Sequence, residues 1–265
     1  MRAALLLALS LCAAPAFAQE VPAWLAGELS VTTGFDYSDG EFGDTHHTTT
    51  LFVPLTLAYL FDHFLPTAYG NDLFELKLTL PWVQATGPGL QGVGVDGSLH
   101  NERRHGLGDI TLGASYLVFP PVRSDLPGLE LSTRIKLPTA SSSDRELLGT
   151  GEASYTLQVD LYKQVGRFTP LLTAGYRFAD APRFNVRNAA FTSVGASWRL
   201  FERLSVGLLY DWYQRSSRSS NDRHELFGYL ALKLRSGLRV TPYAIVGPPG
   251  DWGSGIQLRY SIPVR

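Results

Sequence analysis

Residues 129–140 read LELSTRIKLPTA. Apolar and polar residues alternate here, so an extended strand would carry an apolar face and an ionic face back to back. The fold depends on which of these two faces looks outward, and on what surrounds it. The apolar face comprises Leu129, Leu131, Thr133, Ile135 and Leu137, and the ionic face comprises Glu130, Ser132, Arg134 and Lys136.

The same two-residue alternation recurs along the whole chain, and no segment keeps a helical period over three turns. We therefore predict an all-β protein of about twelve strands. The expected strands cover residues 27–38, 48–60, 72–84, 106–118, 129–140, 152–164, 168–180, 190–200, 204–216, 223–235, 238–246 and 253–264.

The connections between these strands alternate in length. Short joints occur at residues 165–167, 201–203 and 236–237, and two longer, proline-containing joints occur at 61–71 and 119–128. Long loops at one rim and short turns at the other are typical of outer-membrane barrels. Long polar connections occupy 39–47, 85–105, 141–151, 181–189 and 217–222.

A closed barrel of this size cannot fill its interior with apolar side chains. Side chains only just fill a barrel of about eight strands, porins of about sixteen or more strands leave a water channel, and twelve strands lie between these two cases. The apolar faces must then point outward, where only lipid favours them, and the ionic faces line a wet interior. Closure also satisfies every backbone donor and acceptor inside a bilayer. We predict a single antiparallel transmembrane β-barrel with short periplasmic turns and long extracellular loops in the outer membrane of a diderm bacterium.

Aromatic residues fall near both ends of the expected strands, as two interfacial girdles would. The alternative fold is a soluble β-sandwich, which would bury its apolar faces between two sheets. One tier, near the short turns, contains Tyr59, Tyr116, Phe119, Trp198 and Phe201; the other, near the long loops, contains Phe35, Tyr37, Trp82, Tyr155, Tyr176, Phe178, Phe191, Tyr210 and Trp212.

The first 18 residues have the pattern of a signal peptide: a basic start, a short apolar run and Ala16-Phe17-Ala18 before the cleavage point. We assign 1–18 to the leader and 19–265 to one barrel domain. The only cysteine, Cys12, leaves with the leader, so no disulfide holds the mature chain. A lipoprotein is the weaker alternative, since Leu11 precedes Cys12.

Charged residues make up 18% of the chain and the formal net charge is −1, which argues against nucleic-acid binding. Residues 92–97 match the glycine spacing of a dinucleotide fingerprint, but no helix follows them, so we expect a loop and no cofactor. We also expect no metal at the loop histidines, because no carboxylate or cysteine completes a site. These histidines are His46, His47, His100 and His105.

Three segments resemble the bacterial family named for the meta-pathway of phenol degradation. They are residues 105–118, 131–166 and 170–178, with a Gly-Leu-Gly-Asp sequence at 106–109, Leu-Pro-Thr at 137–139 and Leu-Gly-x-Gly at 148–151. The resemblance implies an outer-membrane barrel that gives small molecules, aromatic ones included, a passive route. No catalytic or binding residue is transferred with it.

Membrane lipids and the outer-membrane barrel assembly machinery are the expected partners, besides a small solute. The last strand ends in Ile262-Pro263-Val264-Arg265, whereas outer-membrane strands commonly end on an aromatic residue. The usual assembly signal is therefore altered here.

Strand parity places a set of charged residues inside the barrel. They either brace the wall as salt bridges or form a basic lining that selects small anions or polar aromatics. The candidate lumen-lining residues are Lys77, Arg134, Lys136, Asp160, Arg177, Arg199, Asp211, Lys233, Arg235 and Arg259, and Arg239, Glu75, Asp109, Glu130 and Glu225 share their parity.

Two other functions stay open at this point. The barrel could be non-conducting and serve as a structural or surface-interaction protein. It could also be a lipid-modifying enzyme, which needs a serine and a histidine side by side on the outer face. Ser216 and His224 would meet if the loop around Ser219-Ser220 closes symmetrically. Our expectation is a passive channel without enzymatic activity.

Overall fold

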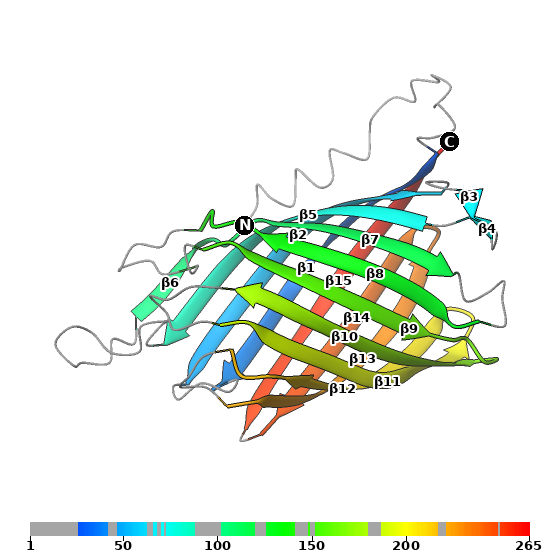
Figure 1. Ribbon diagram of the computed structural model, residues 1–265. Coiled ribbons are helices and arrows are strands. Elements are labelled where there is room, and N and C mark those ends of the chain that lie inside the picture. The colour runs from blue at the N-terminus through cyan, green and yellow to red at the C-terminus, as the bar shows by residue number, and fades with distance from the viewer. Residues whose placement is uncertain are drawn as a thin grey trace.

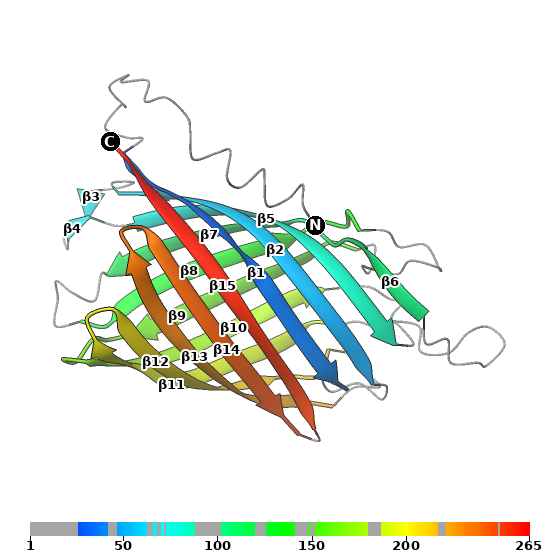
Figure 2. The same ribbon diagram turned by 180° about the vertical axis from the view of Figure 1, so that it is seen from behind.

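The protein forms one closed, antiparallel β-barrel in the computed structural model (Figures 1 and 2). The structure describes residues 26–41, 47–62, 66–67, 70–71, 73–87, 102–119, 126–140, 148, 152–179, 187–216, 221–248 and 250–265. No helix in these ranges is long and apolar enough to cross a membrane. The leader, residues 92–97, His46 and His100 lie outside the described residues.

The strands match the predicted segments closely. A short hairpin, β3 (Pro66–Thr67) with β4 (Gly70–Asn71), lies in the connection between β2 and β5. The wall consists of β1 (Gly27–Gly40), β2 (Thr48–Phe61), β5 (Leu73–Gly87), β6 (Glu102–Leu107), β7 (Thr111–Phe119), β8 (Gly128–Lys136), β9 (Ser154–Tyr162), β10 (Phe168–Ala179), β11 (Ala189–Phe201), β12 (Leu204–Tyr213), β13 (Arg223–Arg235), β14 (Leu238–Gly247) and β15 (Asp251–Val264).

Closure comes from the pairing of the first and last strands. β1 pairs with β2 on one side and with β15 on the other, and Figure 2 shows these three strands side by side. Both β6 and β7 pair with β5, so they are two parts of one interrupted strand, and the wall has twelve strand positions. The prediction of a twelve-stranded barrel is confirmed. The soluble sandwich is excluded because one sheet closes on itself and its large apolar side chains are exposed on the outside instead of packing between two sheets.

The interruption between β6 and β7 corrects two predicted boundaries. The strand expected at 106–118 breaks at 108–110, and the one expected at 129–140 ends at Lys136. Leu137 precedes a proline, which disfavours further regular pairing. We call residues 106–110 with 136–140 the wall joint.

Side chains and backbone of the wall joint bond to one another. The Asp109 carboxylate accepts from Lys136 Nζ at 2.5 Å and from the Ala140 N–H at 3.0 Å. The Ile110 N–H donates to Thr139 Oγ1 at 2.8 Å. The Leu137 N–H donates to the Ile110 carbonyl at 2.8 Å. The Gly-Leu-Gly-Asp sequence at 106–109 and the Leu-Pro-Thr sequence at 137–139 thus meet in this joint.

The outer surface of the barrel is apolar. Large hydrophobic side chains on alternate positions remain exposed, such as Leu157 at 54%, Val194 at 53% and Leu208 at 59%. The intervening positions carry polar side chains that are more buried, such as Ser30 at 2% and Thr173 at 7%. A polar inner face and an apolar outer face are the arrangement that lipid favours and water does not.

Aromatic pairs lie on the outer face at both rims, as predicted for the girdles. At the rim with the long loops, Tyr37 contacts Trp252 with ring centroids 5.2 Å apart, and at the rim with the short turns Tyr59 contacts Phe61 at 4.7 Å. The assignment of Phe191 to a girdle was wrong. Phe191 shares the parity of Ser193, which bonds the inward Asp211, and therefore lies on the inner face.

Candidate functional site

The inner face of the barrel holds a continuous row of polar residues at matched ladder positions. Lys233 pairs with Arg239, and Arg239 pairs with Arg259. The row then continues through four threonines to Lys136 of the wall joint: Thr32, Thr56, Thr79 and Thr111. Because β-strands tilt in a barrel, such a row winds around the wall from the rim with the short turns towards the rim with the long loops.

Two cations of this row have carboxylate partners. Arg259 lies 3.5 Å from Glu28 and 3.7 Å from Glu75, and Lys136 is bonded to Asp109. No ion pair or side-chain hydrogen bond joins Lys233 or Arg239 to another residue in the described ranges. The row therefore contains both bracing cations and free ones.

A second row carries carboxylates that are bonded to hydroxyl groups. Asp160 pairs with Thr173, whose hydroxyl donates to the carboxylate at 2.5 Å. On the next two strands Ser193 donates to Asp211. Glu225, which opposes Asp211, is 5% exposed and contacts Arg223 at 2.9 Å. These hydrogen bonds keep the acids close to the wall.

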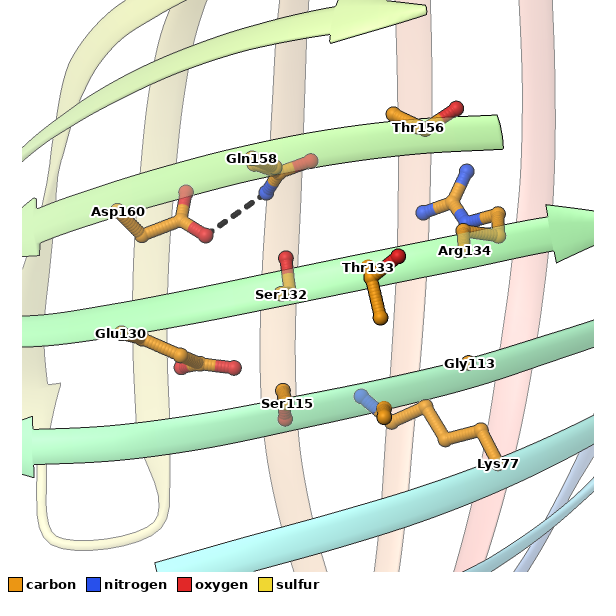
Figure 3. Close-up of a pocket in the computed structure, with 11 residues that line it drawn as sticks. Lys77, Gly113, Ser115, Glu130, Ser132, Thr133, Arg134, Thr156, Gln158 and Asp160 are labelled. Carbon is orange, nitrogen blue, oxygen red and sulfur yellow. Dashed lines mark hydrogen bonds between the residues drawn. The ribbon is translucent and has the colours of Figure 1, made fainter. Parts of the chain in front are cut away.

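A cavity of about 140 Å³ opens in the inner wall between β5 and β9 (Figure 3). It exists because Gly113 separates Lys77 from Arg134 in the ladder and adds no side chain between them. Figure 3 shows the Lys77 side chain extending towards Ser115 and the Arg134 guanidinium extending towards Thr156. The Gln158 amide donates to Asp160 at 2.8 Å. Ser115, Glu130, Ser132 and Thr156 complete its polar lining.

The structure brings some of the predicted residues together and separates others. Lys77, Arg134 and Asp160 share the cavity, and Lys233 and Arg259 share the first row. Arg199 and Arg235 lie at the rim with the short turns, where Arg199 donates to the Gly166 carbonyl at 3.2 Å. Arg177 lies between Thr156 and Ala189 near the other rim. Lys77 is bonded to Glu75 at 2.5 Å.

Sequence reasoning missed a patch of aromatic residues on the inner face. The rings of Phe227 and Tyr243 have centroids 5.3 Å apart, and Phe227 and Tyr229 are 5.8 Å apart. Nearby, the Arg223 guanidinium lies 4.3 Å from the centroid of the Tyr213 ring. The signal was present in the sequence, since Phe227 and Tyr229 share the parity of Glu225 and Lys233.

Two inner glycines allow these rings to lie flat on the wall. A Cβ at Gly207 would collide with the ring of Tyr229, and a Cβ at Gly255 would collide with that of Tyr243. Each ring therefore packs directly over the backbone of the neighbouring strand. This packing holds the two tyrosines against the wall rather than across the interior.

The proposed serine–histidine pair does not form. His224 opposes Trp212 in the ladder, not Ser216, and its Nδ1 lies 2.7 Å from the Tyr210 hydroxyl. The residue opposite His224 is therefore four positions earlier in the chain than the symmetric loop closure predicted. Among the other histidines, His47 contacts Asp39 at 2.9 Å and His105 lies against Trp82. No three histidines, cysteines or carboxylates of the described residues meet as a metal site.

The family described as "Putative MetA-pathway of phenol degradation" matches residues 32–230. No curated protein matches the sequence. Among solved structures, an outer membrane channel from Pseudomonas putida F1 is similar over 94% of this chain and 99% of its own, with 13% identity and a TM-score of 0.69.

Two further structures are similar at lower scores. The translocator domain of the autotransporter NalP from Neisseria meningitidis covers 98% of this chain and 94% of its own, with 10% identity and a TM-score of 0.53. The CymD monoaromatic hydrocarbon channel covers 91% and 89%, with 9% identity and a TM-score of 0.52. At these identities the likeness shows the fold, which is that of Gram-negative outer-membrane barrels.

Proposed function

Because the chain belongs to the family named for the MetA-pathway of phenol degradation, we propose that it is a passive outer-membrane channel for small solutes, aromatic compounds among them. The observation that carries this proposal is that the closed barrel has its apolar side chains outside and its charged side chains inside, which is the opposite of a soluble protein. Its outer face is apolar, and its inner face carries exposed charged side chains such as Lys77, Lys233 and Arg239. Charges in such numbers are tolerated where water reaches them.

The comparisons support the solute class. One structure with this fold is a channel for monoaromatic hydrocarbons, and the family takes its name from phenol degradation. Within the barrel, the inner aromatic patch and the polar cavity offer both ring contacts and hydrogen bonds. A passive channel needs no catalytic group, and the displaced Ser216 leaves the lipid-modifying enzyme without its nucleophile–base pair.

The surroundings of the protein follow from this proposal. The apolar outer face is the surface for outer-membrane lipids. Residues 1–18 would direct export and be removed, leaving 19–265 to be inserted by the barrel assembly machinery. The candidate lumen residues would then line the solute path, with the unpaired cations acting on the solute and the paired ones bracing the wall.

Conductance of the purified protein in planar bilayers tests the channel directly, with swelling of proteoliposomes in phenols, aromatic acids and sugars as the second measurement. Stepwise conductance and solute-dependent swelling are expected. A barrel that inserts and folds, shown by its heat-modifiable migration in gels, but stays closed to ions and to every solute would refute the channel. The non-conducting structural or surface-interaction barrel would then be the better description.

A further inference from the structure

We propose that the interior selects aromatic anions, such as aromatic carboxylates and sulfonates, at a station formed by Tyr229 and Tyr243 on one side and Lys233 and Arg239 on the other. This inference rests on the proposed channel function and deepens it. The family name and the hydrocarbon channel suggest neutral aromatic solutes. The proposed station differs because it recognises the negative charge of the solute as well as its ring.

The first support is that the accessible charge inside the barrel is positive, although the whole chain has a formal net charge of −1. Three inner carboxylates lie against the wall: the side chains of Glu75, Asp109 and Glu225 are 12, 7 and 5% exposed. The Glu28 side chain is 38% exposed but lies 3.5 Å from Arg259. Lys77, which is bonded to Glu75, is still 43% exposed. The exposed inner-face cations are Lys77, Arg134, Arg199, Lys233 and Arg239.

The second support is an arrangement that stability does not explain. Lys233 opposes Arg239, and Arg239 opposes Arg259, on three adjacent strands. Like charges directly opposite one another in a sheet are destabilising. Arg259 is compensated by Glu28 and Glu75, whereas Lys233 and Arg239 have exposed side chains and no charged or hydrogen-bonded partner in the described ranges. An anionic solute would supply the missing partner.

The third support is the position of the rings. Tyr229 pairs with Tyr243 in the same ladder in which Lys233 pairs with Arg239. The ring pair and the cation pair are therefore four residues apart on both strands, about 13 Å along the wall. The inner positions between them are the small residues Ala231 and Thr241. The side chains of Lys233 and Arg239 are long enough to extend part of the way towards the tyrosines. The remaining gap between the charged groups and the tyrosine rings then suits one aromatic ring with its acidic group.

The chemistry of the station follows from its two ends. A solute ring can stack against Tyr229, Tyr243 and the adjoining Phe227, and such aromatic pairs contribute about 0.5–1.5 kcal/mol beyond buried area. The carboxylate or sulfonate then meets an ammonium and a guanidinium at the other end. A single station of this modest strength favours entry of the solute without preventing its release, as a channel requires.

The test compares three aromatic solutes that differ in charge and do not cross bare bilayers readily: benzenesulfonate, phenyl β-glucoside and phenyltrimethylammonium. Their release from preloaded proteoliposomes is measured with the unaltered protein, with the Lys233→Gln/Arg239→Gln variant, and with Arg167→Gln/Arg203→Gln. The last variant removes the same charge from exposed turn positions next to the wall. Empty vesicles serve as the blank.

Benzenesulfonate should leave several-fold faster than the glucoside and faster again than the ammonium compound. The Lys233→Gln/Arg239→Gln variant should lose most of this preference because its benzenesulfonate rate falls towards its glucoside rate, and the turn variant should keep the preference. Tyr229→Leu should lower the rate for benzenesulfonate more than the rate for methanesulfonate.

Equal rates for the three solutes in the unaltered protein, or a preference that survives Lys233→Gln/Arg239→Gln, would overturn the anion station while leaving the channel intact. Release of none of the solutes would instead overturn the channel itself, and the station with it. The glucoside rate therefore separates failure of the inference from failure of the proposed function.

Discussion

Replacing Leu157 with arginine should destabilise the barrel strongly, whereas the same replacement at its neighbour Gln158 should not. Leu157 lies at the centre of β9, on the outer face, with 54% of its surface exposed. Gln158 lies at the same depth on the inner face, where its amide donates to Asp160 at 2.8 Å. The two variants therefore introduce the same charge at the same depth on opposite sides of the wall.

The magnitude follows from the cost of a cation in hydrocarbon. Arginine on the lipid face of a barrel near the bilayer midplane costs about 2–4 kcal/mol. Since 1.4 kcal/mol is tenfold in an equilibrium constant, Leu157→Arg should lower the folding equilibrium constant roughly 30-fold to 700-fold. At position 158 the guanidinium enters the polar interior beside Asp160, so the expected change is within about 0.5 kcal/mol.

Reversible unfolding in urea, with the protein in phospholipid vesicles and followed by tryptophan fluorescence, measures both free energies of unfolding. Heat-modifiable migration in gels confirms that each variant folds before it is titrated. If the two variants lose the same stability, or if Gln158→Arg loses more, the leucine set does not face lipid and the assignment of the two faces is wrong.

Further predictions concern single contacts. Asp109→Asn should cost about 1.5–3 kcal/mol of unfolding free energy, measured by the same titration, because the wall joint loses hydrogen bonds to a charged group; no loss would show that the joint is not a brace. Gly207→Ala should cost about 1–3 kcal/mol, since the added Cβ displaces the ring of Tyr229, and an unchanged midpoint would contradict this packing. Ser216→Ala should leave phospholipase assays of the purified barrel at their background, because His224 is bonded elsewhere; a serine-dependent activity would refute the absence of an enzyme.

The sequence predicted the strands because successive side chains of a strand point to opposite faces, and the barrel wall is a single sheet with lipid on one face and water on the other. Parity alone therefore placed Leu157 outside and Gln158 inside, and the predicted segment at 223–235 matches β13 at both ends. The same rule would have placed Phe191 inside, but Phe191 was assigned to a girdle by residue type rather than by parity. Parity also places Phe227 and Tyr229 inside, but these two residues were assigned to neither face.

Other features depended on register, which parity does not contain. The displacement of Ser216 from His224 followed from where the loop between β12 and β13 begins to turn. The alignment of Lys233 with Arg239 and Arg259 depends on how β13, β14 and β15 pair. The register shifts next to the turn between β13 and β14, so strand parity could not predict which residues oppose one another.

The amino-acid sequence by itself determined that the chain forms a lipid-facing barrel. Apolar and charged residues alternate in so many strands that both faces are well solvated only when the apolar face meets lipid and the charged face meets water inside a closed barrel. Only the tertiary structure decided which inner charges are neutralised. Asp109 finds Lys136 and Arg259 finds Glu28 and Glu75, whereas Lys233 and Arg239 find no partner among the described residues. Ion pairing depends on distances of a few ångströms across strands, and these distances are set by register and by closure of the wall.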